Sequence, residues 1–169
     1  MRVDKPRGKK LFSEEQQFRQ WWLWLLFGGT LLSVIIGNII SPPSPHMMKT
    51  GEGIAAILVG TGIPMLLMLF LYITRFETTV TDEGVYFRWW PFQKKFTEIK
   101  WDEVIEASAR EKLITGLGVK YQIGFGWNHQ VSGQKGVELT LRNRKLWIGT
   151  CKPERFVEAI REARPEVLR

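Results

Sequence analysis

Few residues in this sequence have the types and spacing that catalysis or metal binding requires. His129 lies close to Ser132, but a serine nucleophile also needs an acid that orients the histidine, and no suitably placed acid accompanies this pair. His46 has no clear second metal-binding side chain beside it. The single cysteine, Cys151, excludes an internal disulfide and gives no metal-ligand spacing. We therefore expect a protein that is not an enzyme and that holds no metal and no cofactor.

The stretch from Lys112 to Gly136 is rich in glycine and in polar side chains. Its glycines superficially suggest a phosphate-binding loop, but no Gly-Lys-Ser/Thr follows them and no GxGxxG spacing introduces a helix. Function often concentrates in exposed loops, so this stretch is a candidate partner surface for a lipid headgroup, a peptide or another domain. A long hairpin connection without a role is the alternative. The candidate residues, all expected to be exposed, are Lys112, Lys120, His129 and Lys135.

A second group of candidates combines aromatic rings with lysines in the segment WWPFQKK, residues 89–95. Aromatic rings and ammonium groups suit the headgroup level of a membrane, where each lysine contributes about 1 kcal/mol beside anionic lipid. The alternative is that Trp89 and Phe92 belong to a core and that the lysines are solvated. The predicted membrane-surface residues are Trp90, Phe92, Lys94 and Lys95.

Two long apolar runs must position these candidates. The first, Trp21–Ile40, reads WWLWLLFGGTLLSVIIGNII, and the second, Ile54–Thr74, reads IAAILVGTGIPMLLMLFLYIT; neither contains Asp, Glu, Lys or Arg. A helix needs roughly 20 apolar residues to cross the hydrocarbon core of a bilayer. The sequence therefore predicts a transmembrane helical hairpin over residues 21–74, with a loop at residues 41–53.

Basic residues are unevenly distributed around these runs. Six precede the first run, one lies in the loop, and four lie between residues 75 and 95. The positive-inside rule then places both termini in the cytoplasm and the loop outside the inner membrane. A cleaved signal peptide fits poorly, because the first 20 residues include three acidic side chains. Three tryptophans lie where an aromatic belt at headgroup level is expected: Trp21, Trp22 and Trp24.

Residues 1–20 form a basic segment that we expect on the cytoplasmic side. Residues 1–11 show little periodicity, which suggests a mobile tail. Ser13-Glu14-Glu15-Gln16 matches the capping-box pattern, in which the first and last side chains satisfy exposed N–H groups. This pattern predicts a helix that starts at Ser13 and continues into the membrane.

Small residues recur along both apolar runs at the spacing of a helix face. Gly29, Ser33 and Gly37 repeat every four residues in the first run, and Ala56 and Gly60 do so in the second. Such ridges allow close backbone approach in lipid, where apolar area alone gives little drive for association. They serve either the packing of the hairpin within one chain or homo-oligomerisation, and the sequence leaves both open.

Residues 75–169 change to the period-two pattern of strands. A hairpin is predicted around Asp82–Gly84, a strand at Val119–Phe125, and a further pair at Val137–Leu141 and Leu146–Ile148. Pro153 suits the first turn of a final amphipathic helix. About seven strands followed by one helix predict a pleckstrin-homology-like (PH-like) antiparallel β-barrel with a C-terminal capping helix, and an α+β membrane protein overall.

The same stretch resembles an uncharacterised family of small bacterial membrane proteins. The matching segments are FETTVTDEGVYFRWWPFQKKF, WDEV, LGVKY, VSGQKGVELTL and LWIGTCKPERF. The resemblance implies two transmembrane helices and a cytoplasmic PH-like domain, and it carries over no catalytic residues.

Together these patterns predict a non-enzymatic, membrane-anchored interaction module at the inner membrane surface. Its expected partners are the bilayer, anionic headgroups or a membrane protein. No dense stripe of Lys and Arg is present, so nucleic acid is not an expected partner. The alternative is an accessory subunit of an oligomeric transport or envelope-stress assembly.

Overall fold

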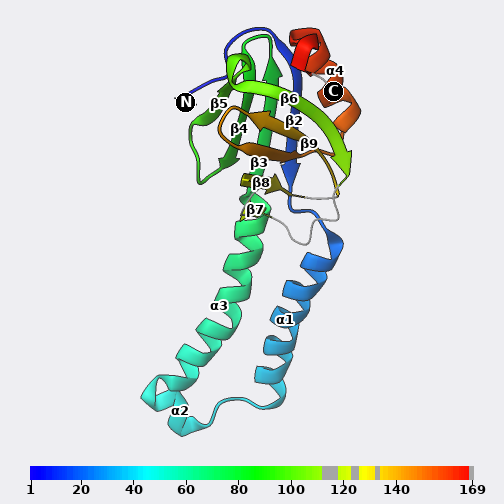
Figure 1. Cartoon of the computed structure of the whole chain (residues 1–169). Coiled ribbons are helices and arrows are strands. Elements are labelled where there is room, and N and C mark those ends of the chain that lie inside the picture. The colour runs from blue at the N-terminus through cyan, green and yellow to red at the C-terminus, as the bar shows by residue number, and fades with distance from the viewer. Residues whose placement is uncertain (112–117, 123–125, 132–133, 168–169) are drawn as a thin grey trace. The chain divides into compact units, whose positions relative to one another are not determined.

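The computed structural model describes residues 1–111, 118–122, 126–131 and 134–167 (Figure 1). The chain divides into two compact units. The first, which we name the β domain, combines Met1–Gln17 with Arg75–Arg169, and the second, the helical hairpin, comprises Phe18–Thr74. The hairpin is thus inserted between two parts of one β domain.

The helical hairpin contains α1 (Trp21–Ile40), α2 (Pro45–Thr50) and α3 (Glu52–Ile73). The two predicted long helices are confirmed, whereas the short α2 inside the predicted loop was not expected. The Ser44 hydroxyl caps α2 by accepting a hydrogen bond from the backbone N–H of Met47. By length and composition, α1 and α3 are able to cross a membrane, which is a weak indication that they do so.

The two long helices contact each other along one face of each. Trp24 of α1 packs edge-to-face on Tyr72 of α3, with ring centroids 6.4 Å apart. Farther along, a Cβ atom added to Gly60 would lie 3.1 Å from Val34 Cγ1, so glycine permits the helices to approach closely there.

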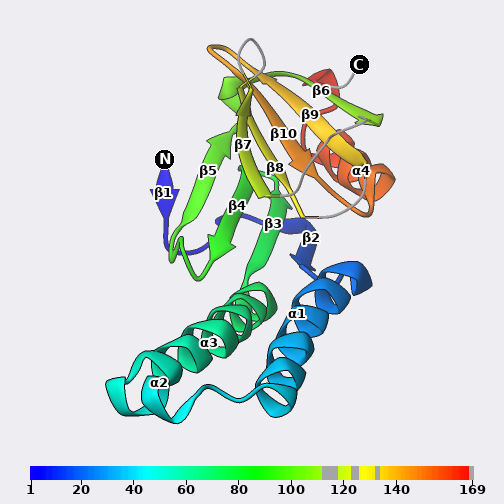
Figure 2. The ribbon, with the colours of Figure 1, turned by 90° about the horizontal axis from the view of Figure 1, so that it is seen from below.

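Sheet A of the β domain has five strands in the order β1-β5-β4-β3-β2 (Figure 2). All its neighbouring strands are antiparallel. Its central strand β4 is paired along β3, which is in turn paired along β2. The strands are β1 (Arg2–Val3), β2 (Lys10–Gln17), β3 (Arg75–Thr81), β4 (Gly84–Trp90) and β5 (Phe96–Lys100).

The prediction of a helix that starts at Ser13 is wrong, because Ser13 lies within strand β2. Residues 12–17 pair continuously with β3, and Gln16 lies opposite Phe76. Without β2, the backbone N–H and C=O groups along one side of β3 would have no hydrogen-bond partner in the sheet. Unpaired backbone groups of this kind cost free energy when they are buried. A partner 60 residues away in sequence thus overrides the local capping pattern.

The prediction of a mobile tail is also wrong, because β1 and the start of β2, both strands of sheet A, lie within residues 1–11. Val3 lies opposite Phe96 and is buried in a cluster with Phe96 and Tyr86. The backbone N–H of Lys9 donates a 2.7 Å hydrogen bond to Asp82 Oδ1. This segment therefore covers part of the outer face of the sheet.

Sheet B has five strands in the order β6-β9-β10-β8-β7. β10 and β8 are parallel, so this sheet is mixed. The β8 strand was not predicted, because the sequence indicated a loop there. The strands are β6 (Val104–Glu111), β7 (Gly118–Gln122), β8 (Gly126–Gln130), β9 (Lys135–Leu141) and β10 (Lys145–Gly149), and a 3-10 turn at Trp101–Glu103 connects the two sheets.

Helix α4 (Pro153–Ala163) confirms the predicted C-terminal helix and is followed by a 3-10 turn, Pro165–Val167. It buries Phe156, Ala159 and Ile160 and contacts β2, β3, β6 and β9. The described strands form two separate sheets, and no ladder between them closes a barrel. The β domain is therefore an α+β unit of two five-stranded sheets with a helix against both.

Candidate binding surfaces

One end of sheet A carries both chain connections to the helical hairpin. Gln17, the last residue of β2, lies opposite Arg75, the first residue of β3, and Arg75 lies opposite Trp90 on β4. Only residues 18–20 separate β2 from α1, and only Thr74 separates α3 from β3. We name this end, marked by Gln17, Arg75 and Trp90, the hairpin-side edge.

The predicted membrane-surface residues lie at this edge or in the turn after it. Trp90 is 38% exposed and Phe92 is 61% exposed, whereas Trp89 is buried in the core. The Arg75 guanidinium lies 5.8 Å from the centroid of the Trp90 ring. The structure thus brings an exposed aromatic pair and an arginine to the end of the sheet from which the helices leave.

The cations at this edge are partly neutralised. Arg75 forms a 3.2 Å ion pair with Glu15, and Lys95 forms a 3.1 Å ion pair with Asp4. Lys94 is exposed, and its backbone carbonyl accepts a hydrogen bond from Arg88. The net positive charge here is therefore smaller than the sequence alone indicated.

The aromatic residues at the start of α1 differ in exposure. Trp21 and Trp22 are exposed, whereas Trp24 is half-buried against Tyr72. The first two are therefore free to face lipid, and the third contributes to the contact between α1 and α3.

The small-residue ridge of α1 faces away from α3. Gly29, Ser33 and Gly37 are exposed, and a Cβ atom added to either glycine would meet no atom within 4 Å. On α3, Ala56 is exposed and Gly60 contacts Val34. Packing within the hairpin thus uses Gly60 but not the α1 ridge, and the role of that ridge in homo-oligomerisation stays a prediction.

His129 is buried, so its predicted exposure in a loop is wrong. On β8 it lies in the core beside Phe76 and Phe87, with ring centroids 5.9 Å and 4.8 Å away. Trp89 Nε1 donates a 2.9 Å hydrogen bond to His129 Nδ1. Burial, and secondarily the positive charge of Arg144, lower the pKa of His129 from 6.5 to about 4. The ring is therefore neutral at pH 7.

The other predicted loop residues are not brought together with His129. Lys120 is exposed on β7, whereas Lys135 is on β9, which β8 and β10 separate from β7, and forms a 3.2 Å ion pair with Glu111. Lys112 lies outside the described residues. The stretch from residue 112 to 136 therefore does not form one partner surface among the residues that the structure describes.

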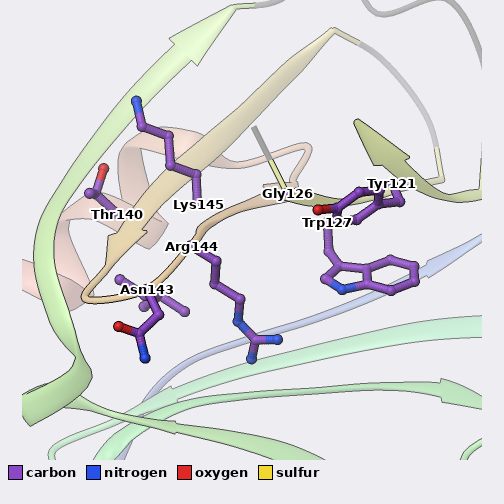
Figure 3. Close-up of a pocket in the computed structure, with 8 residues that line it drawn as sticks. Tyr121, Gly126, Trp127, Thr140, Asn143, Arg144 and Lys145 are labelled. Carbon is purple, nitrogen blue, oxygen red and sulfur yellow. The ribbon is translucent and has the colours of Figure 1, made fainter. Parts of the chain in front are cut away.

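The sequence reasoning missed a cleft beside sheet B, one half of which is lined by sheet B alone and the other half by strands of both sheets. Two adjoining pockets, each of about 500 Å³, share Trp127 and Arg144. Figure 3 shows these two side chains in the pocket that also includes Tyr121. The signal that could have indicated it is the alternation in GVKYQ and GWNHQ, which places aromatic residues on one face of a hairpin.

Comparison with known proteins adds no assignment to these surfaces. The sequence matches no protein-family model, and no curated protein is significantly similar to it. The function must therefore be inferred from the geometry of the chain itself.

Proposed function

We propose that this chain is a non-enzymatic, membrane-anchored binding module. In this proposal α1 and α3 cross the inner membrane and the β domain lies on the cytoplasmic side. The proposal is supported by the absence of Asp, Glu, Lys and Arg between residues 21 and 40 and between residues 54 and 74. We further propose a PH-like binding role. The order of elements, strands of two sheets followed by α4, resembles that of a PH-like domain.

The observation that carries the proposal is the ladder between β2 and β3. Residues before α1 pair with residues after α3, so both parts of the β domain must lie on the same side of any membrane. Two crossings satisfy this requirement, whereas one crossing does not. The excess of basic residues next to the hairpin favours the cytoplasm as that side.

The hairpin-side edge is the proposed contact with lipid headgroups. The short connections, residues 18–20 and Thr74, keep this edge within a few residues of the ends of the helices. Trp90 and Phe92 would insert their rings at the headgroup level, and Lys94 would add about 1 kcal/mol beside anionic lipid. Lys95 would add less while it is paired with Asp4.

Anchoring then provides the mechanism. A domain confined to the membrane surface meets lipids and membrane proteins at a raised effective concentration, so even weak contacts become significant. No group transfer is needed for this role.

A fluorescent probe at residue 92 tests the contact with lipid. The Phe92→Cys variant, in a Cys151→Ser background, is labelled with an environment-sensitive dye and placed in nanodiscs with or without phosphatidylglycerol. We expect a blue shift with anionic lipid that a Lys94→Glu change reduces. A label at Asp102, beyond the opposite end of sheet A, should not respond. Identical spectra at both positions and in both lipids would contradict the proposed contact.

A second candidate function is a subunit of an oligomeric membrane assembly. The exposed α1 ridge favours it, because close-packing surfaces of small residues promote helix association in lipid. The mass of the detergent-solubilised protein tests this candidate: a strict monomer would argue against it, and a Gly29→Ile change should dissociate any oligomer built on the ridge.

A further inference from the structure

The apolar inner face of sheet B extends beyond the core that the helix and sheet A cover. Four directly opposed residues form one row across this face: Leu139 on β9, Leu146 on β10, Trp127 on β8 and Tyr121 on β7. Along this row the exposed fraction rises from 0% and 2% to 41% and 64%. The same face is therefore buried at one side and open at the other.

Helix α4 does not cover the open part. It contacts β2, β3, β6 and β9, whereas the half of the cleft that holds His129 is lined by β1, β4, β5, β7, β8 and β10. In the other half of the cleft, Tyr121 and Trp127 lie edge-to-face, with ring centroids 5.3 Å apart. The cleft thus presents preformed aromatic walls, a feature typical of small-molecule sites.

The charge of the cleft has one sign. Its described lining residues include Arg2, Arg144 and Lys145, and none of them is Asp or Glu. Lys145 is paired with Glu138 at 3.0 Å. Within the described part of the chain, no carboxylate or carbonyl oxygen pairs with the Arg144 guanidinium. Figure 3 shows the Arg144 and Trp127 side chains extending into the same pocket. A bound anion would find an available planar donor there.

A neutral donor faces the same space. Because the indole N–H of Trp89 can only donate, His129 Nδ1 must accept, and the neutral ring then carries its proton on Nε2. His129 lines the cleft, and no described residue supplies an acceptor for Nε2. The polar side chains of Gln93, Thr97 and Asn143 also line the cleft.

We propose that this cleft binds a small aromatic anion, an arene that carries a carboxylate or a phosphate. The ring packs against Trp127 and Tyr121, and the anionic group accepts hydrogen bonds from Arg144, with the His129 Nε2–H as a further donor. A volume of about 500 Å³ in each half of the cleft accommodates such a molecule. The inference does not depend on the proposed membrane contact, because Trp90, Phe92, Lys94 and Lys95 do not line the cleft.

Calorimetric titration of the full chain in phosphatidylcholine nanodiscs tests the proposal. The probe is 2-naphthyl phosphate, and inorganic phosphate is the anion without a ring. We expect the probe to bind at least about tenfold more tightly than inorganic phosphate, Arg144→Gln to weaken it by about tenfold, and Trp127→Leu by roughly fivefold.

Arg142→Gln is the matched control, since Arg142 is an exposed arginine of the same turn that does not line the cleft. It should leave probe binding unchanged. The near-ultraviolet circular dichroism of each variant reports whether the β domain is folded, and both arginines are exposed, so folding should be retained. Equal affinities for the two probes, or equal losses in the two arginine variants, would overturn the proposal.

A lipid arm distinguishes a soluble anion from a headgroup. Nanodiscs that contain phosphatidylglycerol should leave the calorimetric affinity for 2-naphthyl phosphate unchanged. If anionic lipid instead displaces the probe in wild type but no longer competes in Arg144→Gln, the cleft binds a headgroup and the assignment to an aromatic anion is wrong.

Discussion

Acidification should destabilise the β domain through one side chain, His129. The pKa of this ring is lowered from 6.5 to about 4 in the folded chain, first by burial and then by Arg144. Between these values the unfolded chain binds the proton and the folded chain does not, so the unfolding free energy must fall as the pH falls. Each unit of pKa difference corresponds to about 1.4 kcal/mol, so the full shift gives about 3 kcal/mol between pH 7 and pH 4.

Denaturant unfolding of the full chain in a mild non-ionic detergent measures this loss, with near-ultraviolet circular dichroism as the signal of the β domain. Carboxylates also titrate in this range, so the quantity of interest is the difference between wild type and His129→Gln. Glutamine retains an acceptor for Trp89 Nε1 but cannot take up a proton. We expect the wild type to lose about 3 kcal/mol more than the variant between pH 7 and pH 4.

The pKa can also be followed directly. The chain contains two histidines, so selective labelling of the imidazole carbons gives two nuclear magnetic resonance signals, and His46→Gln assigns them. The Arg144→Gln variant should raise the pKa of His129 above about 4 but leave it below 6.5, because burial is the larger cause. Titration of the wild-type ring near 6.5, or parallel pH dependences of wild type and His129→Gln, would refute this reasoning.

Three other variants test the packing of the β domain. Arg88→Met should lower the unfolding free energy measured in denaturant by about 2 kcal/mol, because it leaves the mostly buried Glu77 carboxylate unpaired. Lys135→Met, which breaks the exposed pair with Glu111, should lower it by less than about 0.5 kcal/mol. Gly136→Ala should lower the unfolding free energy by about 2 kcal/mol, since the new Cβ would lie 2.6 Å from the Trp147 ring. Replacement of residues 18–74 by a short Asn-Gly turn should give a soluble, folded β domain by gel filtration and circular dichroism, because β2 and β3 then form an ordinary hairpin. An aggregated or unfolded product of that replacement would show that the β domain needs the helices.

The sequence predicted the elements whose signals are local. The bounds of α1 and the start of α4 at Pro153 follow from composition and from the fit of proline to the first turn of a helix. The hairpin of β3 and β4 follows from alternation around an acidic turn. These elements depend on neighbours within a few residues, and here the long-range contacts agree with the local signals.

The sequence did not predict the elements whose partners are distant. The capping pattern at Ser13 is sound locally, but the edge of β3 provides more backbone hydrogen bonds than a helix end does. His129 was expected in a polar loop, because the glycine-rich, polar stretch Asn128–Gly136 indicated a turn. Its burial depends on Phe76 and Trp89, which belong to the other sheet. The cleft likewise joins residues from both ends of the chain.

Thiol labelling of intact cells tests the central claim, that one β domain is built from both sides of a membrane hairpin. The native Cys151 is exposed in the β domain and reports its side of the membrane. In a Cys151→Ser background, Lys5→Cys reports the residues before α1, and Lys49→Cys reports the loop between the helices. A membrane-impermeant maleimide should label only the Lys49→Cys variant in intact cells, and all three proteins after lysis. Labelling of Cys151 and of the Lys5→Cys variant from opposite sides would make the ladder between β2 and β3 impossible and would contradict the account.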